Sequence, residues 1–347
     1  MEALWYAIAA LTLAVYVVMD GFDFGAGALH LWVARRDAER RQVLAAIGPF
    51  WDGNEVWLLA AGGVLFLAFP KALAAGLSGF YLAIMLVLWL LILRGIAIEF
   101  RSHVGDGLWR AFWDGTFGLA STLLPLLFGV ALGNLLRGVP LDADGWFALA
   151  LFASGSPRGA LGILDGFTLL TGLFALAALA HHGALFLAWK TEGAVRARSR
   201  AAAGWLFPIV LVLWAVTTAA TAALAPELFA AFALRPLAWL AAALFVAGFA
   251  TSLAARGAGR DLAAFLGSAA FLLGLLGATA ATLFPTLIPA ADRRQALTAF
   301  NTAASRASLA AGLRWWPLGL LLAIAYIAVV FRLHRGRCGP AAVDGRD

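Results

Sequence analysis

The stretch MDGFDFGAGALH, residues Met19 to His30, places charge and glycine where the surrounding chain is continuously apolar. Two aspartates, Asp20 and Asp23, and three glycines fall within its first nine residues. A carboxylate at the centre of a membrane costs about 2.5–3.5 kcal/mol, and glycine weakens an isolated helix. The stretch is therefore stable in a membrane only where neighbouring helices or enclosed water shelter the acids.

The composition of the whole chain identifies lipid as its solvent. Hydrophobic residues make up 63% of the 347 residues and charged residues 13%, with a mean hydropathy of +0.90. Soluble domains are roughly 45–50% apolar and 25% charged, so this chain is an integral membrane protein. A single cysteine, Cys338, excludes a disulfide framework. The net charge of +6 is spread over short loops, which favours membrane topology over nucleic-acid binding as its explanation.

The apolar runs predict an all-α protein with nine transmembrane helices. A spanning helix needs about 20 mostly apolar residues. The first run lacks the basic start of a cleavable signal peptide, so we expect this run to remain as a span. The second run is short and opens with polar residues. The nine segments are Trp5–Val33, Trp51–Phe69, Ala72–Ile98, Trp113–Leu136, Leu161–Trp189, Trp205–Leu224, Leu237–Ala255, Leu262–Ile288 and Trp315–Phe331.

Lysine and arginine divide unevenly between the two sets of loops that nine spans create. The loops on the side of the N-terminus hold eight of the 25 basic residues, and the opposite loops hold the other 17. Because basic loops stay in the cytoplasm, we expect the N-terminus outside and the C-terminus in the cytoplasm. The eight on the outer side are Lys71, Arg137, Arg158, Arg235, Arg293, Arg294, Arg306 and Arg314.

Asp20 and Asp23 are three residues apart, so they share one face of the first helix. Gly21 and Gly25 form a small-xxx-small pair and Gly27 adds a further notch, which allows a neighbouring helix to approach closely. Ionisable residues inside membranes usually serve a function, here the movement of protons or cations. The alternative is that the acids are structural and hydrogen-bond to neighbouring helices.

A second polar cluster, PFWDGNEVWLLAAGG at residues 49–63, opens the second span. Asp52 and Glu55 share a face near a helix N-terminus, where the helix dipole stabilises carboxylates. Asp52 as an N-cap is one interpretation, but Gly53, Asn54 and Glu55 continue the polarity beyond what capping requires. Both clusters lie toward the cytoplasmic side of the nine-span arrangement. We therefore expect the four carboxylates to line one inward-facing entrance suited to proton uptake.

The end of the third span, LRGIAIEFRSH at residues 93–103, brings further charge to the same side. Arg94, Glu99, Arg101 and His103 are candidate supporting charges for the entrance. Surface ion pairs and snorkelling of long side chains explain them equally well.

Five histidines raise the question of haem or metal binding. His181 and His182 are adjacent, so they point about 100° apart on a helix and cannot hold one ion from one face. We interpret the histidines as helix-interface residues, with no metal site and no haem ligand on this chain. No nucleotide, zinc or dithiol motif is present in the sequence, so we expect no complete catalytic centre on this chain alone. The five are His30, His103, His181, His182 and His334.

These segments resemble subunit II of the cytochrome bd-type quinol oxidases, including the cyanide-insensitive branch. The WDGNEVWL block is highly specific, whereas LGILDGFTLLTGL departs from the family by having Asp165-Gly166-Phe167 in place of an Asn-Pro-Phe-type start. The matching motifs follow the family's order and are DGFDFGAGAL (20–29), RRQVLAAIGPFWDGNEVWLLAAGGVLFLAFP (40–70), SGFYLAIMLVLWLLILRGIAIEFR (78–101), GNLLRGVP (133–140), HGALFLAWKTEG (182–193) and TLFPTLIP (282–289).

The resemblance implies two four-helix bundles plus one peripheral helix within a single transmembrane domain over residues 1–335. The first bundle is expected at about 1–137, the second bundle with the peripheral helix at about 138–335, and a disordered cytoplasmic tail at 336–347. The implied complex is a heterodimer in the bacterial inner membrane that oxidises quinol and reduces dioxygen to water. The haem-bearing subunit I would hold two haems b and one haem d, and this chain would ligate none.

The resemblance also assigns roles to residues. Asp52 would help to form the cytoplasmic proton path to the haem site, with Asp23 in a supporting role. Asp20 and Glu55 are expected on the same path, beside the supporting Asn54, Arg94, Glu99 and Arg101. Some members hold a structural quinone or an oxygen passage in this subunit, and a small single-helix subunit is a further candidate partner.

Two rival interpretations differ in kind from the oxidase. Intramembrane carboxylates and glycines also suit a proton-coupled secondary transporter, which would work alone. A purely structural subunit, whose acids never exchange protons, is the second rival.

Overall fold

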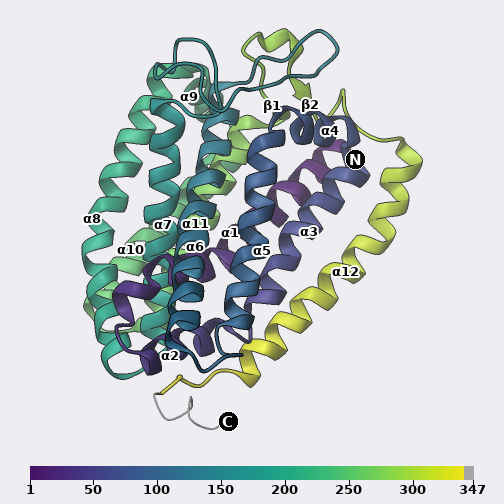
Figure 1. Ribbon diagram of the computed structural model, residues 1–347. Helices are drawn as coiled ribbons and strands as arrows, with labels where there is room; N and C mark the ends of the chain where they lie inside the picture. The colour runs from purple at the N-terminus through teal and green to yellow at the C-terminus, as the bar shows by residue number, and fades with distance from the viewer. Residues whose placement is uncertain (340–347) are drawn as a thin grey trace.

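The computed structural model describes residues 1–339 and consists of helices connected by loops, with one small hairpin (Figure 1). The predicted all-α membrane fold is confirmed. Some of the long helices begin after a residue whose side chain caps them: Asp106 and Ser305 accept hydrogen bonds from the Trp109 and Ser308 amides. The elements are α1 (Glu2–Val33), α2 (Asp37–Ile47), α3 (Trp51–Ala68), α4 (Pro70–Gly79), α5 (Tyr81–Phe100), α6 (Gly107–Arg137), α7 (Gly166–Lys190), α8 (Gly193–Leu224), α9 (Pro226–Ala233), α10 (Pro236–Gly257), α11 (Asp261–Leu283), β1 (Thr286–Ile288), a 3-10 turn (Arg293–Gln295), β2 (Leu297–Thr298) and α12 (Arg306–Leu333).

Eight helices within residues 1–339 are long and apolar enough to cross a membrane, namely α1, α5, α6, α7, α8, α10, α11 and α12. The remaining predicted span corresponds to α3, which has 18 residues and opens with polar side chains. In Figure 1, α3 runs between the same two ends of the bundle as the other eight helices. We call the end that carries α2 the α2 end, and the end that carries the N-terminus, α4, α9, β1 and β2 the α4 end.

The bundle is built around α7, and α12 lies at its edge. In an apolar 18-residue segment of α7, 72% of the residues are buried, whereas none is buried within this chain in the corresponding segment of α12. Figure 1 shows α12 inclined along the outside of α3, so α12 takes the place of the expected peripheral helix. Helix α1 packs along both α6 and α7. The two predicted bundles therefore share a continuous interface.

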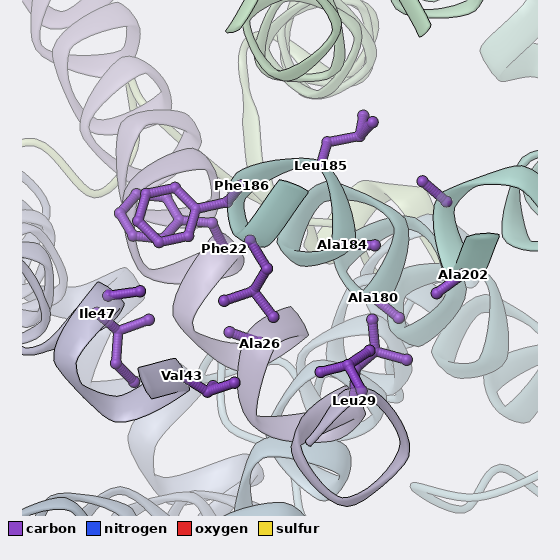
Figure 2. Packing of buried hydrophobic residues seen from close by; sticks show 14 of the residues in the cluster. Phe22, Ala26, Leu29, Val43, Ile47, Ala180, Ala184, Leu185, Phe186 and Ala202 are labelled. Atoms are coloured by element: carbon purple, nitrogen blue, oxygen red, sulfur yellow. The ribbon is translucent and has the colours of Figure 1, made fainter. Parts of the chain in front are cut away.

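Aromatic and small side chains fill the core between α1, α2 and α7 (Figure 2). Phe22 stacks on Phe186 with ring centroids 4.1 Å apart, and Ala26 and Ala184 are fully buried beside them. Small residues at this crossing let the helices come close, which gains dispersion contacts that lipid cannot supply.

Several predicted boundaries were wrong, because local breaks interrupt apolar runs. The run Ala72–Ile98 is two helices that meet at Phe80, and α4 starts with Pro70 at its first position. Phe147, from the loop after α6, occupies the surface of Gly79, where a Cβ would lie 2.2 Å from its ring. The run Leu262–Ile288 includes β1, and the fifth span starts at Gly166 rather than Leu161.

The loops at the α4 end form a compact cover over the helices. Gly138 ends α6 with φ +89°, a conformation that favours glycine, and lets Val139 pair with the backbone of Pro289 and Ala291. Strand β1 pairs with β2 in an antiparallel hairpin. Segments far apart in sequence thereby close one end of the bundle.

The start of the predicted disordered tail is wrong for residues 336–339. The Cys338 amide donates to the Lys190 carbonyl at 2.7 Å, and the Gln42 side chain donates to the Cys338 carbonyl at 2.6 Å. The Lys190 ammonium donates to the carbonyls of His334 and Gly336. Residues 340–347 lie outside the described residues.

Candidate functional site

Asp20 and Asp23 are completely buried on α1, which stays helical through all three of its glycines. The glycines face neighbouring helices at very short range. A Cβ on Gly25 would lie 2.0 Å from the Leu179 carbonyl oxygen, and one on Gly183 would lie 2.3 Å from the Gly25 carbonyl carbon. Helices α1 and α7 are thus in backbone contact.

Gly27 performs a similar task against α6. A Cβ at this position would lie 2.1 Å from the Ser121 hydroxyl oxygen and 2.9 Å from the Phe117 ring. Gly21 is less crowded, since its Cβ would meet only the flexible Leu179 side chain, at 2.9 Å. The absent side chain at Gly27 is what admits the Ser121 hydroxyl to the surface of α1.

Arg94, from α5, connects carboxylates of α1 and α3. Its guanidinium donates to Asp20 Oδ1 at 2.7 Å and to Glu55 Oε1 at 2.5 Å, and it lies 4.5 Å above the Phe24 ring. Arg94 is fully buried, whereas the Glu55 side chain is 30% exposed. The interpretation of Arg94 as a snorkelling surface residue is therefore wrong.

Asp23 is held by an amide instead of a cation. The Asn54 side chain of α3 donates to Asp23 Oδ2 at 2.7 Å. Asp20 Oδ2 and Asp23 Oδ1 are buried without a hydrogen-bond partner among the described residues. We call Asp20, Asp23, Asn54, Glu55 and Arg94 the acid cluster. With one arginine for three carboxyl groups, the acid cluster carries either excess negative charge or bound protons.

Asp52 does not join the acid cluster. It lies exposed in the first turn of α3, on the same end of the bundle as the cluster, and α3 begins after Phe50 rather than after Asp52. The interpretation of Asp52 as an N-cap is therefore wrong. The expected grouping of four carboxylates is also wrong for this chain: three meet, because Asp52 and Glu55 diverge enough around α3 for only Glu55 to reach Arg94.

A second buried charge network surrounds Asp114 of α6, closer to the α2 end than the acid cluster. Asp114 accepts from His30 Nε2 at 2.7 Å, from Arg101 Nε at 2.6 Å and from Arg40 at 3.0 Å. Arg101 also donates to Asp37 of α2 at 2.7 Å. We call these five residues the Asp114 network. Arg101 is 1% exposed, so the alternative interpretation of surface snorkelling is wrong here too.

Sequence reasoning missed Asp114, although an acid inside an apolar span is a usable signal. It named Arg101 as a supporting charge and His30 as a helix-interface residue, but it did not identify their common partner. Glu99 lies exposed on α5, outside both the acid cluster and the Asp114 network, and His103 contacts the Glu99 backbone carbonyl at 2.8 Å.

The two groups are aligned along the α1–α6 contact. Asp23, Gly27 and His30 are spaced to share one face of α1. Asp114 and Ser121 are likewise seven residues apart on α6 and face α1. The Ser121 hydroxyl and His30 Nδ1 are buried and have no hydrogen-bond partner among the described residues. Buried polar atoms without protein partners are typical of sites that hold ordered water.

His182 and His181 lie buried in α7. His182 Nε2 donates to the Val18 carbonyl at 3.0 Å, and its Nδ1 lies 2.6 Å from the Ser268 hydroxyl. The two ring nitrogens of His182 are thus used in helix packing, whereas His181 packs on Phe207 with ring centroids 5.8 Å apart. In residues 1–339, no three His, Cys, Asp or Glu side chains are grouped for metal binding.

Glu39 ties α2 to the start of α8. Burial alone would raise the pKa of Glu39, but hydrogen bonds from the Arg35 and Arg36 amides, the Arg36 side chain and the nearby Arg198 lower that pKa to about 2. Arg198 donates to Glu39 at 2.5 Å and to the Val33 carbonyl at 2.7 Å. Ionic contacts therefore join α2 to α8 at the α2 end.

An apolar cavity of about 390 Å³ opens between α6, α7, α8, α10 and α11. Tyr16 and Phe24 form its inner wall, which backs onto the acid cluster, and Trp214 and Phe245 line it further out. Thr217 also lines it, and the Thr217 hydroxyl is buried without a partner among the described residues.

This geometry defines a class: a multi-pass membrane protein whose helices enclose carboxylates and arginine. The family model of cytochrome bd terminal oxidase subunit II matches residues 1–334. The chain therefore belongs to the cytochrome bd terminal oxidase subunit II family, and the resemblance seen in the sequence is confirmed.

Individual relatives agree with this assignment. The cytochrome bd-I ubiquinol oxidase subunit 2 of Escherichia coli (strain K12) is 39% identical over 213 residues, which cover 61% of this chain and 55% of that protein. The matched region thus spans about half the length of that relative. The probable cytochrome oxidase subunit 2 of Haemophilus influenzae is 31% identical over 98% of this chain and 96% of its own length. The bd oxidase structure from Geobacillus thermodenitrificans has a TM-score of 0.71 at 21% identity, covering 96% of this chain and 98% of its own, which supports the fold.

Proposed function

We propose that this chain is the subunit without haem in a quinol-oxidising, dioxygen-reducing membrane complex, and that it supplies part of the cytoplasmic proton path. The observation that carries the proposal is the acid cluster: three carboxyl groups lie in the interior of a membrane bundle, two of them bound to Arg94 and the third to the Asn54 amide. Membership in the subunit II family gives no support to the alternative of a proton-coupled transporter that works alone.

The distribution of basic residues supports an orientation with the α2 end in the cytoplasm. Most arginines and lysines belong to the loops and helix ends at the α2 end, including Arg35, Arg36 and Arg198. Cytoplasmic loops carry such an excess because basic segments are translocated poorly. The acid cluster and the Asp114 network then both lie on the cytoplasmic side of the bundle.

The haem-bearing subunit I would dock on the outward faces of α3 and α5. Val56, Leu59 and Phe66 of α3 are 56%, 73% and 71% exposed, and Trp89 of α5 is 63% exposed. Asp52 lies exposed at the α2 end of the same helix. A carboxylate at the edge of an apolar docking face is well placed to pass protons across it, which accords with the role that the family resemblance gives to Asp52.

Within this chain, the proton path would follow the α1–α6 contact. Protons would enter at the Asp114–His30 pair, pass the Ser121 hydroxyl through enclosed water, and reach Asp23. Each step uses a buried polar atom, namely His30 Nδ1, the Ser121 hydroxyl or Asp23 Oδ1, that has no hydrogen-bond partner within residues 1–339. Arg94 would hold Asp20 and Glu55 in place, and the half-exposed Glu55 would connect the cluster to the docking face.

The structural quinone found in some family members would fit the apolar cavity. Aromatic walls suit an isoprenoid chain, and the unpartnered Thr217 hydroxyl is a donor for a quinone carbonyl. When bound, the quinone would pack against the apolar side chains of α6, α8 and α11. We assign it no step in proton transfer.

The decisive experiment compares Asp23→Asn and Ser121→Ala with Glu99→Gln in the purified complex. Quinol-dependent oxygen consumption should fall at least about tenfold for Asp23→Asn, because the amide cannot carry a proton. Ser121→Ala should lower the rate less, since water can fill the site. Glu99→Gln, which removes an exposed carboxylate from the same end, should leave the rate unchanged.

Haem spectra separate a proton defect from failed assembly. A full haem complement with a low rate supports the path. Wild-type rates for Asp23→Asn, Asp52→Asn and Ser121→Ala, measured on fully assembled complexes, would reject the proton-path role and leave the purely structural interpretation.

A further inference from the structure

A second cavity, of about 350 Å³, lies at the α2 end, away from both the acid cluster and the Asp114 network. It is formed where the ends of α7, α8, α10 and α11 meet. Its polar wall consists of Arg200, Arg256 and Asp261, and its apolar floor is made by Leu185, Ala203 and Ala264.

The charges in and around this cavity do not balance. Among residues 1–339, Asp261 is the one carboxylate in the lining, and three arginines converge on it: Arg196 at 2.7 Å, Arg200 at 2.7 Å and Arg337 at 3.8 Å. Arg256 also lines the cavity and adds a fourth positive charge. The site therefore carries a net positive charge that an anion would neutralise.

Arg256 is the least satisfied of these cations. Its guanidinium lies 5.4 Å from the centre of the Phe207 ring, and its Nη1 atom is 3.0 Å from where a Cβ on Gly204 would be. Its Nε atom is buried without a hydrogen-bond partner among the described residues. An aromatic ring and a glycine surface hold the group in place but do not neutralise it.

Exposed apolar side chains lie within three residues of the lining residues on the same helices, and we call these side chains the rim of the cavity. Trp205 of α8 is 52% exposed, Leu253 of α10 is 44% exposed, and Leu262 and Leu266 of α11 are 44% and 55% exposed. A cationic hollow bordered by exposed apolar side chains matches a lipid, with its charged headgroup inside and its acyl chains along the rim.

We propose that this cavity binds the phosphate headgroup of an anionic phospholipid, held by Arg200 and Arg256, with the acyl chains against α8, α10 and α11. Guanidinium groups pair with phosphate oxygens through charge-assisted hydrogen bonds, and Asp261 keeps Arg200 oriented through its Nε bond. The apolar rim favours a phospholipid over a free phosphate ion.

The test is lipid binding to the protein purified from its native membranes, delipidated and studied by native mass spectrometry. Dioleoylphosphatidylglycerol should bind in preference to dioleoylphosphatidylcholine. Arg256→Gln should weaken phosphatidylglycerol binding about tenfold, the effect of losing one charge-assisted hydrogen bond. Arg260→Gln removes an exposed charge from the same end, outside the cavity lining, and should change binding less than about twofold.

Three results would overturn the proposal. Equal losses for Arg256→Gln and Arg260→Gln would indicate attraction by surface charge alone. Equal binding of the two lipids would exclude recognition of the anionic headgroup. Binding of inorganic phosphate that depends on Arg256, without binding of phosphatidylglycerol, would assign the cavity to a soluble anion. None of these outcomes depends on oxidase activity, so they are independent of the proposed proton path.

Discussion

Replacing Gly25 with alanine tests the closest helix contact in the molecule. The added Cβ would lie 2.0 Å from the Leu179 carbonyl oxygen and 2.8 Å from the Gly183 backbone nitrogen. A carbon–oxygen contact of this kind needs about 3.3 Å, so α1 and α7 must separate by about 1.3 Å locally. The obstructing atoms are backbone and cannot rotate away. We therefore expect a loss of about 3 kcal/mol or more, at the upper end of the range for overpacked interiors.

The assay is thermal unfolding of the detergent-solubilised protein, followed by tryptophan fluorescence. Gly25→Ala should lower Tm by about 5 °C or more. Gly115→Ala is the matched control, because a Cβ at Gly115 meets nothing within 4 Å in the interior of α6. That control should be neutral or stabilising by about 0.5–1 kcal/mol, since alanine favours helix. If Gly25→Ala melted at or above the Tm of Gly115→Ala, the inferred backbone contact would be wrong.

The remaining predictions concern charge and capping. Arg94→Gln should lower stability by about 3–5 kcal/mol by leaving buried carboxylates unpaired, and adding Asp20→Asn should recover part of the loss in unfolding experiments. Because the folded-state pKa of Glu39 is depressed from 4.5 to about 2, its contribution to stability is present above pH 4.5 and lost as pH falls toward 2; in Glu39→Gln, a plot of Tm against pH should lack that decline. Asp165→Ala should cost about 1–2 kcal/mol in chemical unfolding, since Asp165 caps α7 through the Phe167 and Thr168 amides and pairs with Arg137.

Much of the fold follows from composition, because membrane helices must satisfy every backbone group internally. Apolar runs of sufficient length therefore predicted the long helices. Apolar runs could not predict the helix break at Phe80, because this break depends on Phe147, which inserts from a loop distant in sequence. The contacts of residues 336–339 were missed for a similar reason: they rely on hydrogen bonds to Gln42 and Lys190, far away in sequence.

The sequence predicted which residues of the candidate site share a helix face, but it did not predict which residues pair between helices. Helical spacing placed Asp20 and Asp23 on one face, yet it could not reveal which neighbour supplied their partners. Arg94 and Asn54 reach them from α5 and α3, and the choice depends on how those helices are rotated. The same rotation turns Glu55 inward and leaves Asp52 exposed, so two acids in one motif have different surroundings.

The combination of acid and glycine in the stretch around residues 19–30 has a single physical explanation. A glycine between Asp23 and His30 removes the side chain that would otherwise fill the space between two polar groups. The Ser121 hydroxyl takes that space, within 2.1 Å of where the Cβ would be. Gly27→Ala would therefore disturb polar continuity as well as packing, whereas Gly25 serves packing against α7 alone. Gly27 is thus required for the continuity of polar groups between Asp23 and His30. Gly25 is required for the close crossing of α1 and α7.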